Sequence, residues 1–165
     1  MIIVVMGVAG AGKSTVAAHL ARRLGFRFVD GDSLHPPRNV RKMSAGRPLS
    51  DDDREEWLRS LGGLVAEADR SGTGLVLACS ALREVYRRTL RERGGDVRFV
   101  YLRASPSLAA ERAEARSGHF MPAALVASQF EALEEPGDAL VVDAARPPEA
   151  LADEIVRALA PPGSR

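Results

Sequence analysis

The segment GVAGAGKS, from Gly7 to Ser14, holds the residues whose spacing most clearly predicts chemistry. Its Gly-x-x-x-x-Gly-Lys-Ser order matches the phosphate-binding loop, and it stands between an apolar run and a helical pattern, as such a loop requires. Glycines let backbone N–H groups converge on a phosphate at the positive end of a helix, which a turn that merely links strand to helix does not need. The pattern therefore predicts a site for a nucleoside triphosphate.

Two side chains of this loop, Lys13 and Ser14, are expected to contact different parts of the bound nucleotide. Lys13 is predicted to reach the β- and γ-phosphate oxygens, and the Ser14 hydroxyl is predicted to coordinate Mg²⁺. Lysine occurs elsewhere only at Lys42, so its use at position 13 favours a site that needs a compact ammonium rather than a guanidinium. The predicted nucleotide contacts in the loop are Gly7, Gly10, Ala11, Gly12, Lys13, Ser14 and Thr15.

Two carboxylates, Asp30 and Asp32, end the second apolar run with one glycine between them. Open α/β sheets bind ligands at the carboxyl ends of their strands, so this pair is expected beside the phosphate loop. We predict that Asp30 supports Mg²⁺ and that Asp32 orients an acceptor hydroxyl and takes its proton. An Asp-Gly-Asp turn with a purely structural role is the alternative, which the phosphate loop nearby disfavours.

A pair of arginines, Arg112 and Arg116, lies four residues apart on one face of a predicted helix. Arg112 is expected to stack on the adenine base, and Arg116 is expected to hold the oxygens of the phosphoryl group in transfer. A solvated helix face is the alternative. Ser117 and Gly118 then break the helix, as a hinge requires, which predicts a mobile cationic lid over about 116–126.

These features together favour a small-molecule kinase among the proteins that carry phosphate loops. A GTPase is disfavoured because the chain contains no Asn-Lys-x-Asp motif for reading the base, and the chain is short for a motor ATPase. A kinase needs an acceptor pocket, a carboxylate near the acceptor hydroxyl and a closing cation, and the sequence supplies a candidate for each.

The order of elements predicts a three-layer α/β domain. Short apolar runs alternate with helical patterns, and strands that are apolar throughout belong to a parallel sheet covered by helices on both faces. We expect one domain over 1–165 with a frayed tail at 161–165. The predicted strands are 2–6, 26–30, 75–79, 97–102 and 139–143, and the predicted helices are 13–24, 51–71, 82–93, 106–116, 122–134 and 147–159.

Composition excludes several other classes of protein. A formal net charge of +1 argues against a broad nucleic-acid-binding face. No stretch approaches the roughly 18 apolar residues of a membrane span, and no basic region precedes the first apolar run as in a signal peptide. Cys79 is the only cysteine, so an internal disulfide is excluded and a cytoplasmic location is expected.

The chain resembles the gluconokinase family, small phosphate-loop kinases related in fold to shikimate and nucleoside monophosphate kinases. The resemblance implies ATP-dependent phosphorylation of D-gluconate at its 6-hydroxyl to give 6-phosphogluconate, a five-stranded parallel sheet, a closing lid and a homodimer. Two positions depart from the family pattern: Arg83 and Ser117 stand where lysines are frequent. The resemblance rests on GVAGAGKS, the block from Asp30 to Leu58, CSALREVYRRTLR, GHFMP and QFEALEEP.

The acceptor pocket for such a substrate needs a cation for the carboxylate and several hydrogen-bonding groups for the hydroxyls. We expect Arg83 or Arg87 to bind the carboxylate, and His35 and Ser80 to bind hydroxyls. A kinase for another small hydroxy acid such as shikimate, or an ATP-binding regulatory module without catalysis, is the alternative function. The full set of predicted substrate contacts is Asp32, His35, Arg38, Ser80, Arg83, Arg87 and His119.

Overall fold

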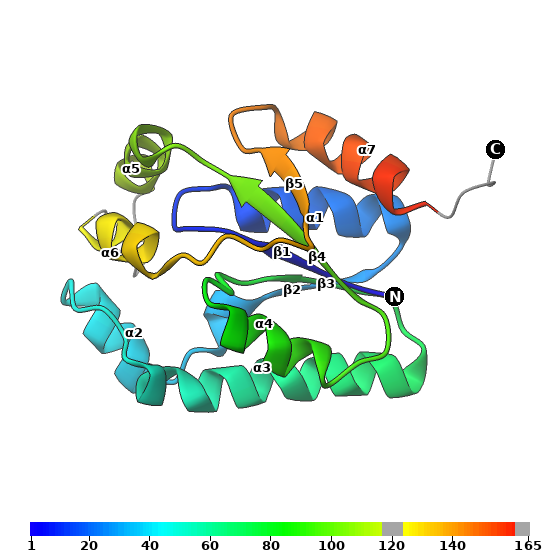
Figure 1. Ribbon diagram of the computed structural model, residues 1–165, viewed down its shortest axis with the longest axis horizontal. Helices are drawn as coiled ribbons and strands as arrows, with labels where there is room; N and C mark the ends of the chain where they lie inside the picture. Colours follow the sequence, from blue (N-terminus) through cyan, green and yellow to red (C-terminus); the bar gives the residue numbers. More distant parts are fainter. Residues whose placement is uncertain (117–123, 161–165) are drawn as a thin grey trace.

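A parallel five-stranded sheet forms the centre of the molecule, in the order β2-β3-β1-β4-β5. The computed structural model describes residues 1–116 and 124–160. The central strand β1 is buried along its whole length, because helices cover both faces of the sheet (Figure 1). The strands are β1 (Ile2–Met6), β2 (Arg27–Asp30), β3 (Leu75–Ala78), β4 (Val97–Arg103) and β5 (Leu140–Asp143).

Helices cover the two faces of the sheet and its carboxyl end. α1 (Lys13–Leu24) and α7 (Pro148–Leu159) lie on one face, and α3 (Asp51–Ser71) and α4 (Glu84–Arg91) lie on the other. Figure 1 also shows further helices gathered at the end of the sheet opposite the N-terminus. These are α2 (Pro37–Ser44), α5 (Pro106–Ala115) and α6 (Leu125–Ala132).

Alternation along β1 divides the core between the two faces. Ile3 and Val5 pack with α1 and α7, whereas Ile2, Val4 and Met6 pack with α3 and α4. The predicted three-layer α/β fold with a five-stranded parallel sheet is confirmed. No helix in the described ranges is long and apolar enough to cross a membrane.

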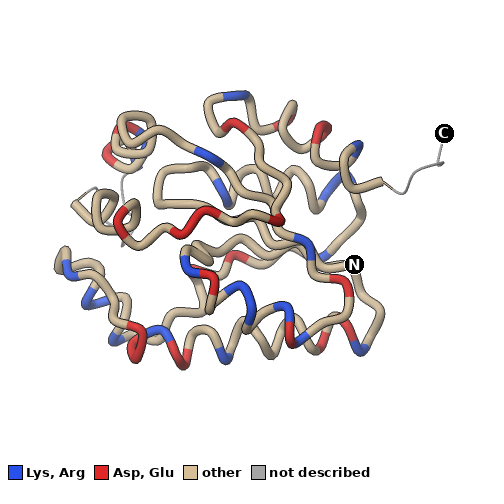
Figure 2. The backbone as a smooth tube through the Cα atoms, in the orientation of Figure 1, with Lys and Arg blue, Asp and Glu red and all other residues tan. Residues whose placement is uncertain are grey.

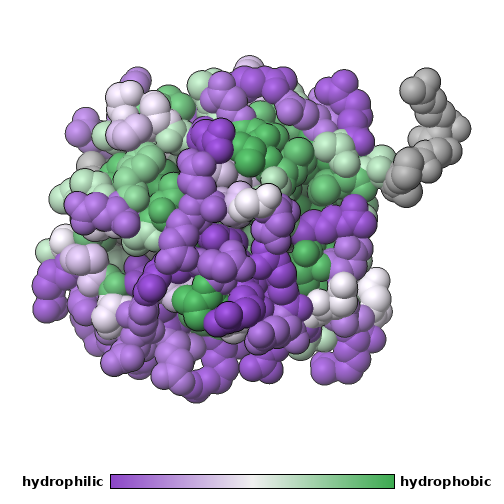
Figure 3. All heavy atoms as spheres, in the orientation of Figure 1, coloured by the Kyte–Doolittle hydropathy of each residue, from purple (hydrophilic) through white to green (hydrophobic). Residues whose placement is uncertain are grey.

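The surface is charged and mixed. Lys and Arg alternate with Asp and Glu along α3 in Figure 2, and no element in that view carries a long stripe of one sign. Figure 3 shows a mostly hydrophilic face over α3 and α4, with hydrophobic residues exposed around the edge strand β5. Val141 of β5 is one of the exposed large apolar residues.

The segment after β2 contains a short helix that is absent from the predicted elements. A 3₁₀ turn, η1 (Gly31–Leu34), follows β2 directly, and α2 begins at Pro37. Proline is favoured in the first turn of a helix, since its missing N–H would have no intrahelical partner there. The Pro36-Pro37 pair therefore starts a helix, and this helix becomes one wall of the site.

Candidate active site

The phosphate loop is held by backbone conformations that favour glycine. Gly7, Gly10 and Gly12 have φ angles of 149°, 80° and 91°, all outside the range that other residues readily adopt. Gly10 is also in close contact with α5, because a Cβ atom there would lie 2.1 Å from the backbone oxygen of Ala109. The loop thus needs glycine at position 10 for its conformation and for its packing against α5.

The carboxylates after β2 meet the loop through hydrogen bonds. Ser14 Oγ donates to Asp30 Oδ2 at 2.6 Å, and the other oxygen of Asp30 accepts from the backbone N–H of Asp32 at 3.0 Å. Trp57 of α3 fixes the intervening glycine, since its Nε1–H donates to the Gly31 carbonyl at 2.7 Å. Ser14 and Asp30 together present oxygen atoms of the kind that Mg²⁺ prefers, so these residues fit the ion.

Lys13 lies at the centre of this arrangement. Its Nζ donates to the Val8 carbonyl at 3.0 Å, which places the ammonium group over the loop. Burial lowers the pKa of Lys13 from its ordinary value, while the carboxylates of Asp32 and Asp30 act in the opposite direction. Anionic phosphate oxygens would compensate this desolvated cation.

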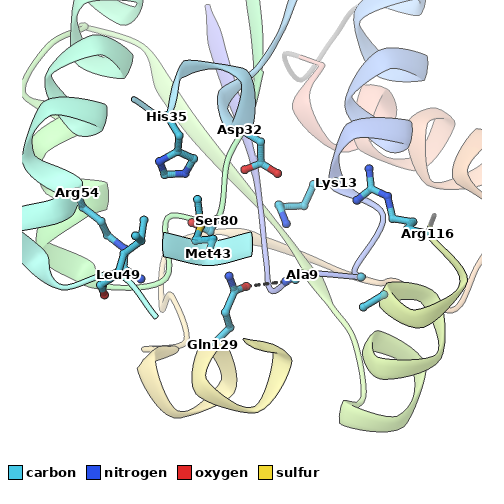
Figure 4. Close-up of a pocket in the computed structure, with 12 residues that line it drawn as sticks. Ala9, Lys13, Asp32, His35, Met43, Leu49, Arg54, Ser80, Arg116 and Gln129 are labelled. Atoms are coloured by element: carbon cyan, nitrogen blue, oxygen red, sulfur yellow. Dashed lines mark hydrogen bonds between the residues drawn. The ribbon is translucent and has the colours of Figure 1, made fainter. Parts of the chain in front are cut away.

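A pocket opens beside Lys13, at the carboxyl ends of β1, β2 and β3. Figure 4 shows the side chains of Asp32 and Lys13 close together in it, with His35 and Arg54 on one side and Arg116 on the other. Cations, one carboxylate and several neutral hydrogen-bonding groups therefore face one small space. The polar side chains that line the pocket are Lys13, Asp32, His35, Arg54, Ser80, Arg116 and Gln129.

A second pocket lies on the other side of the loop, between α1, α5 and the turn before α7. Arg112 fixes one wall, because its Nη1 donates to the Ala144 carbonyl at 2.8 Å and to the Ala11 carbonyl at 3.4 Å. Gly10 and Arg116 line both pockets. Two ligands bound in the two pockets would therefore meet at the phosphate loop.

His35 lines the same pocket as Asp32 and has a lowered pKa. Its ring stacks on Trp57 with a centroid distance of 4.5 Å and an interplanar angle of 10°. Burial lowers the pKa of His35 to about 4, Asp32 opposes the change and Arg54 adds to it. The imidazole is consequently neutral at physiological pH.

Proteins of known family are similar in sequence to this chain. The family described as AAA domain matches residues 2–136. A gluconokinase of Gluconobacter oxydans (strain 621H) is 46% identical over 158 residues, which cover 94% of this chain and 89% of that protein. The thermoresistant gluconokinase of Escherichia coli (strain K12) is 44% identical over 152 residues, which cover 90% and 87%. The chain belongs to the gluconokinase family.

A solved structure agrees with this assignment. The crystal structure of a gluconokinase from Sinorhizobium meliloti 1021 superposes with a TM-score of 0.80 at 44% identity, covering 95% of this chain and 94% of that one. The resemblance to gluconokinases that the sequence motifs indicated is confirmed. The structure of this chain shows where each predicted site residue lies.

Three arginines predicted for the acceptor lie outside the lining of the pocket. Arg38 points to Glu56, with 2.8 Å between Nη2 and Oε2, and its side chain is 56% exposed. Arg83 pairs with Asp51 at 2.6 Å and with Glu134 at 3.4 Å. These partners are themselves exposed acids, so both arginines join surface segments rather than face the site.

Arg87 is buried, and its charge serves the fold. Only 1% of its side chain is exposed, and its Nη1 donates to the carbonyls of Ala81 at 2.9 Å and Leu82 at 3.1 Å. Ala81 has a φ angle of 43°, an unfavourable value for a residue with a side chain. Arg87 thus stabilises the strained turn that carries Ser80 into the pocket, and the structure gives no support for its predicted contact with a carboxylate.

Two of the polar side chains that line this pocket were not predicted from the sequence. Arg54, in the first turn of α3, lines the pocket beside Lys13 and donates through Nη1 to the Leu49 carbonyl at 2.5 Å. Gln129 of α6 reaches the phosphate loop, where its Oε1 accepts from the backbone N–H of Ala9 at 2.7 Å (Figure 4). For Arg54, the three-residue spacing from Trp57 was an available signal, because residues so spaced share a helix face.

The predicted lid at 116–126 falls partly beyond the described residues. Arg116 ends α5 as its C-cap residue and is exposed. The segment 117–123, which includes the predicted substrate contact His119, lies outside the described residues, as does the predicted frayed tail at 161–165.

Proposed function

We propose that this protein transfers the γ-phosphoryl group of ATP to the 6-hydroxyl of D-gluconate, giving 6-phosphogluconate and ADP. The observation that carries the proposal is the meeting of two pockets at Gly10 and Arg116, with Lys13 and Asp32 close together in one of them. Membership of the gluconokinase family supports the choice of gluconate over shikimate or another hydroxy acid.

The nucleotide is assigned to the pocket beside α1 and α7. Backbone N–H groups of the loop and the ammonium of Lys13 bind the phosphate oxygens, at the N-terminus of α1. Arg112 supports the wall on which the adenine base rests. Ser14 and Asp30 are the residues that would hold Mg²⁺, which when bound neutralises charge on the phosphate oxygens.

The acceptor is assigned to the pocket beside η1, α2 and α3. Asp32 orients the 6-hydroxyl and accepts its proton, and Arg116 stabilises negative charge on the phosphoryl group in transfer. Because phosphoryl transfer needs little covalent help, positioning and charge stabilisation supply most of the rate acceleration.

Arg54 is our candidate for binding the gluconate carboxylate, in place of Arg83 and Arg87. It is the arginine on the side of the pocket opposite Arg116, so a gluconate chain that bound Arg54 at its acid end would extend toward the phosphate loop. One arm of its guanidinium is anchored on the Leu49 carbonyl, which holds the charge in position. Tyr86 adds to this, since the guanidinium lies 5.7 Å from its ring centroid.

The test of this function is ADP release measured with ATP, Mg²⁺ and a panel of acceptors. We expect release that depends on gluconate, a product heavier by one phosphate, and no comparable rate with shikimate. Tight ATP binding without acceptor-dependent ADP release would instead favour a regulatory ATP-binding module. Removal of Mg²⁺ by a chelator is expected to abolish turnover and its return to restore it.

The variant Asp32→Asn tests the assigned base, with Asp52→Asn as a matched control on the exposed start of α3. Asp32→Asn is expected to lower kcat by about 10²-fold or more with little effect on ATP affinity. Unchanged turnover in Asp32→Asn would remove the role assigned to this residue.

The homodimer and the cytoplasmic location stay predictions, which light scattering and cell fractionation test.

A further inference from the structure

Asn39 is a buried polar residue whose contacts point to a task in the acceptor pocket. It lies on α2, is 1% exposed, and joins two other walls of the site. Its Nδ2 donates to the Asp53 carbonyl of α3 at 2.7 Å and lies 3.5 Å from Nδ1 of His35. The side chain therefore connects the start of α3 with the histidine that lines the pocket.

The Asp53 contact fixes which way the Asn39 amide faces. A backbone carbonyl can only accept a hydrogen bond, so the atom 2.7 Å from it must be the amide nitrogen rather than the amide oxygen. Asn39 Oδ1 is then left buried without a hydrogen-bond partner among the described residues. The contact of Nδ2 with Asp53 therefore sets the orientation of the amide, although it leaves Oδ1 unsatisfied.

The amide nitrogen in turn fixes the protonation of His35. Nδ2 can only donate, so its hydrogen bond with Nδ1 of His35, at 3.5 Å, requires Nδ1 to be the lone-pair atom of the ring. The charged groups that face the ring among the described residues are Asp32 from η1 and Arg54 from α3. Stacking on Trp57 and burial keep the ring neutral, so its one hydrogen is on Nε2.

We propose that Asn39 is a positioning residue that holds His35 as the neutral Nε2–H tautomer, so that Nε2–H donates to a hydroxyl oxygen of the acceptor substrate. The hydroxyl contact rests on the proposed function, whereas the tautomer does not. In this role His35 is a fixed donor. It neither carries charge toward the substrate nor exchanges a proton with it, and this leaves Asp32 as the proton acceptor of the pocket.

The tautomer is tested by ¹⁵N NMR of the free protein labelled at histidine. The chain has 3 histidines, and the signals that disappear in His35→Gln identify His35. We expect an unprotonated Nδ1 and a protonated Nε2 from about pH 5 to pH 8. A hydrogen on Nδ1, or a doubly protonated ring at pH 7, would overturn the proposal.

The role of Asn39 is tested by Asn39→Asp. A carboxylate at this position accepts from Nδ1–H and stabilises the imidazolium, so the pKa of His35 should rise and the ring should titrate within the range studied. An unchanged His35 titration in the folded variant contradicts the positioning role. If Asn39→Asp does not fold, Asn39→Leu removes the donor instead, and we expect both tautomers to appear. A single Nε2–H tautomer in Asn39→Leu would equally contradict the role.

The contact with substrate is tested by two replacements of His35 that differ in reach. The amide nitrogen of glutamine can stand in for Nε2, whereas that of asparagine reaches only the position of Nδ1. We expect the KM for gluconate to be about tenfold higher in His35→Asn than in His35→Gln. The KM for ATP should be the same in both variants. Equal KM values for gluconate would overturn the donor role. If neither enzyme nor variant phosphorylates gluconate, the proposed function fails, and the NMR spectrum still decides the tautomer.

Discussion

The substitution Gly10→Ala tests how the phosphate loop is held in shape. Gly10 has a φ angle of 80°, and its position against α5 leaves no space for a methyl group. Gly72, which ends α3, is a matched control, because its φ angle is 68° and an added Cβ would meet nothing within 4 Å. The two glycines share the left-handed conformation and differ in their packing.

The expected cost follows from these two contributions. A residue with a side chain in the left-handed region costs roughly 1–2 kcal/mol, which applies to both variants. At position 10 the methyl group would lie 2.1 Å from the Ala109 carbonyl oxygen, so the loop or α5 must move, and such overpacking adds about 1–3 kcal/mol. We expect Gly10→Ala to lower the free energy of unfolding by about 2–5 kcal/mol and Gly72→Ala by about 1–2 kcal/mol.

Urea denaturation and ATP binding measure the two consequences. A displaced loop no longer aims its N–H groups at the phosphates, so ATP affinity should fall in Gly10→Ala and stay at the wild-type value in Gly72→Ala. If both variants lost the same stability and both bound ATP normally, the close approach of α5 to the loop would have no energetic role, and the reasoning would be refuted.

Three further substitutions test two residues that line the acceptor pocket and one that supports the fold. Arg54→Lys should raise the KM for gluconate about tenfold or more, because lysine cannot make the forked contact with a carboxylate. Gln129→Glu should keep an acceptor for the Ala9 N–H but weaken ATP binding about tenfold by placing a negative charge beside the phosphates. Arg87→Met should lower the free energy of unfolding by about 2–4 kcal/mol, because it leaves the turn carbonyls without their donor.

Each of these outcomes has a result that would contradict it. Steady-state kinetics with an unchanged KM for gluconate in Arg54→Lys would exclude a carboxylate contact. Calorimetry with unchanged ATP affinity in Gln129→Glu would place the phosphates away from α6. Arg88→Met is the control for Arg87→Met in urea denaturation, because Arg88 is the exposed neighbour on the same helix. Equal losses of stability in the two would show that the buried guanidinium adds nothing.

The layers of the fold could be predicted because each signal was local. Apolar runs between helical patterns gave all five strands within a residue or two, and the phosphate loop identified where strand and helix meet. α2 was missed, because its Pro-Pro start suggests a loop and its polar composition gives no long apolar stripe. Met43 of α2 is buried against Leu49, a few residues after the helix, and against Leu125 of α6, a contact between distant segments that no local pattern could indicate.

The acceptor site shows why the position of an arginine in the sequence does not reveal whether it binds the substrate carboxylate. Arg87 was predicted from its position after the third strand, yet the turn before α4 adopts a strained conformation whose carbonyls need a buried donor, and Arg87 is that donor. Arg54 was not among the predicted residues, and in the sequence it stands among the acids that begin α3. What brings it to the pocket is Trp57, one turn later on the same face, which packs beneath His35 and fixes how α3 is rotated. The rotation of one helix thus decides which arginine can meet a carboxylate, and that rotation depends on contacts between residues far apart in the chain.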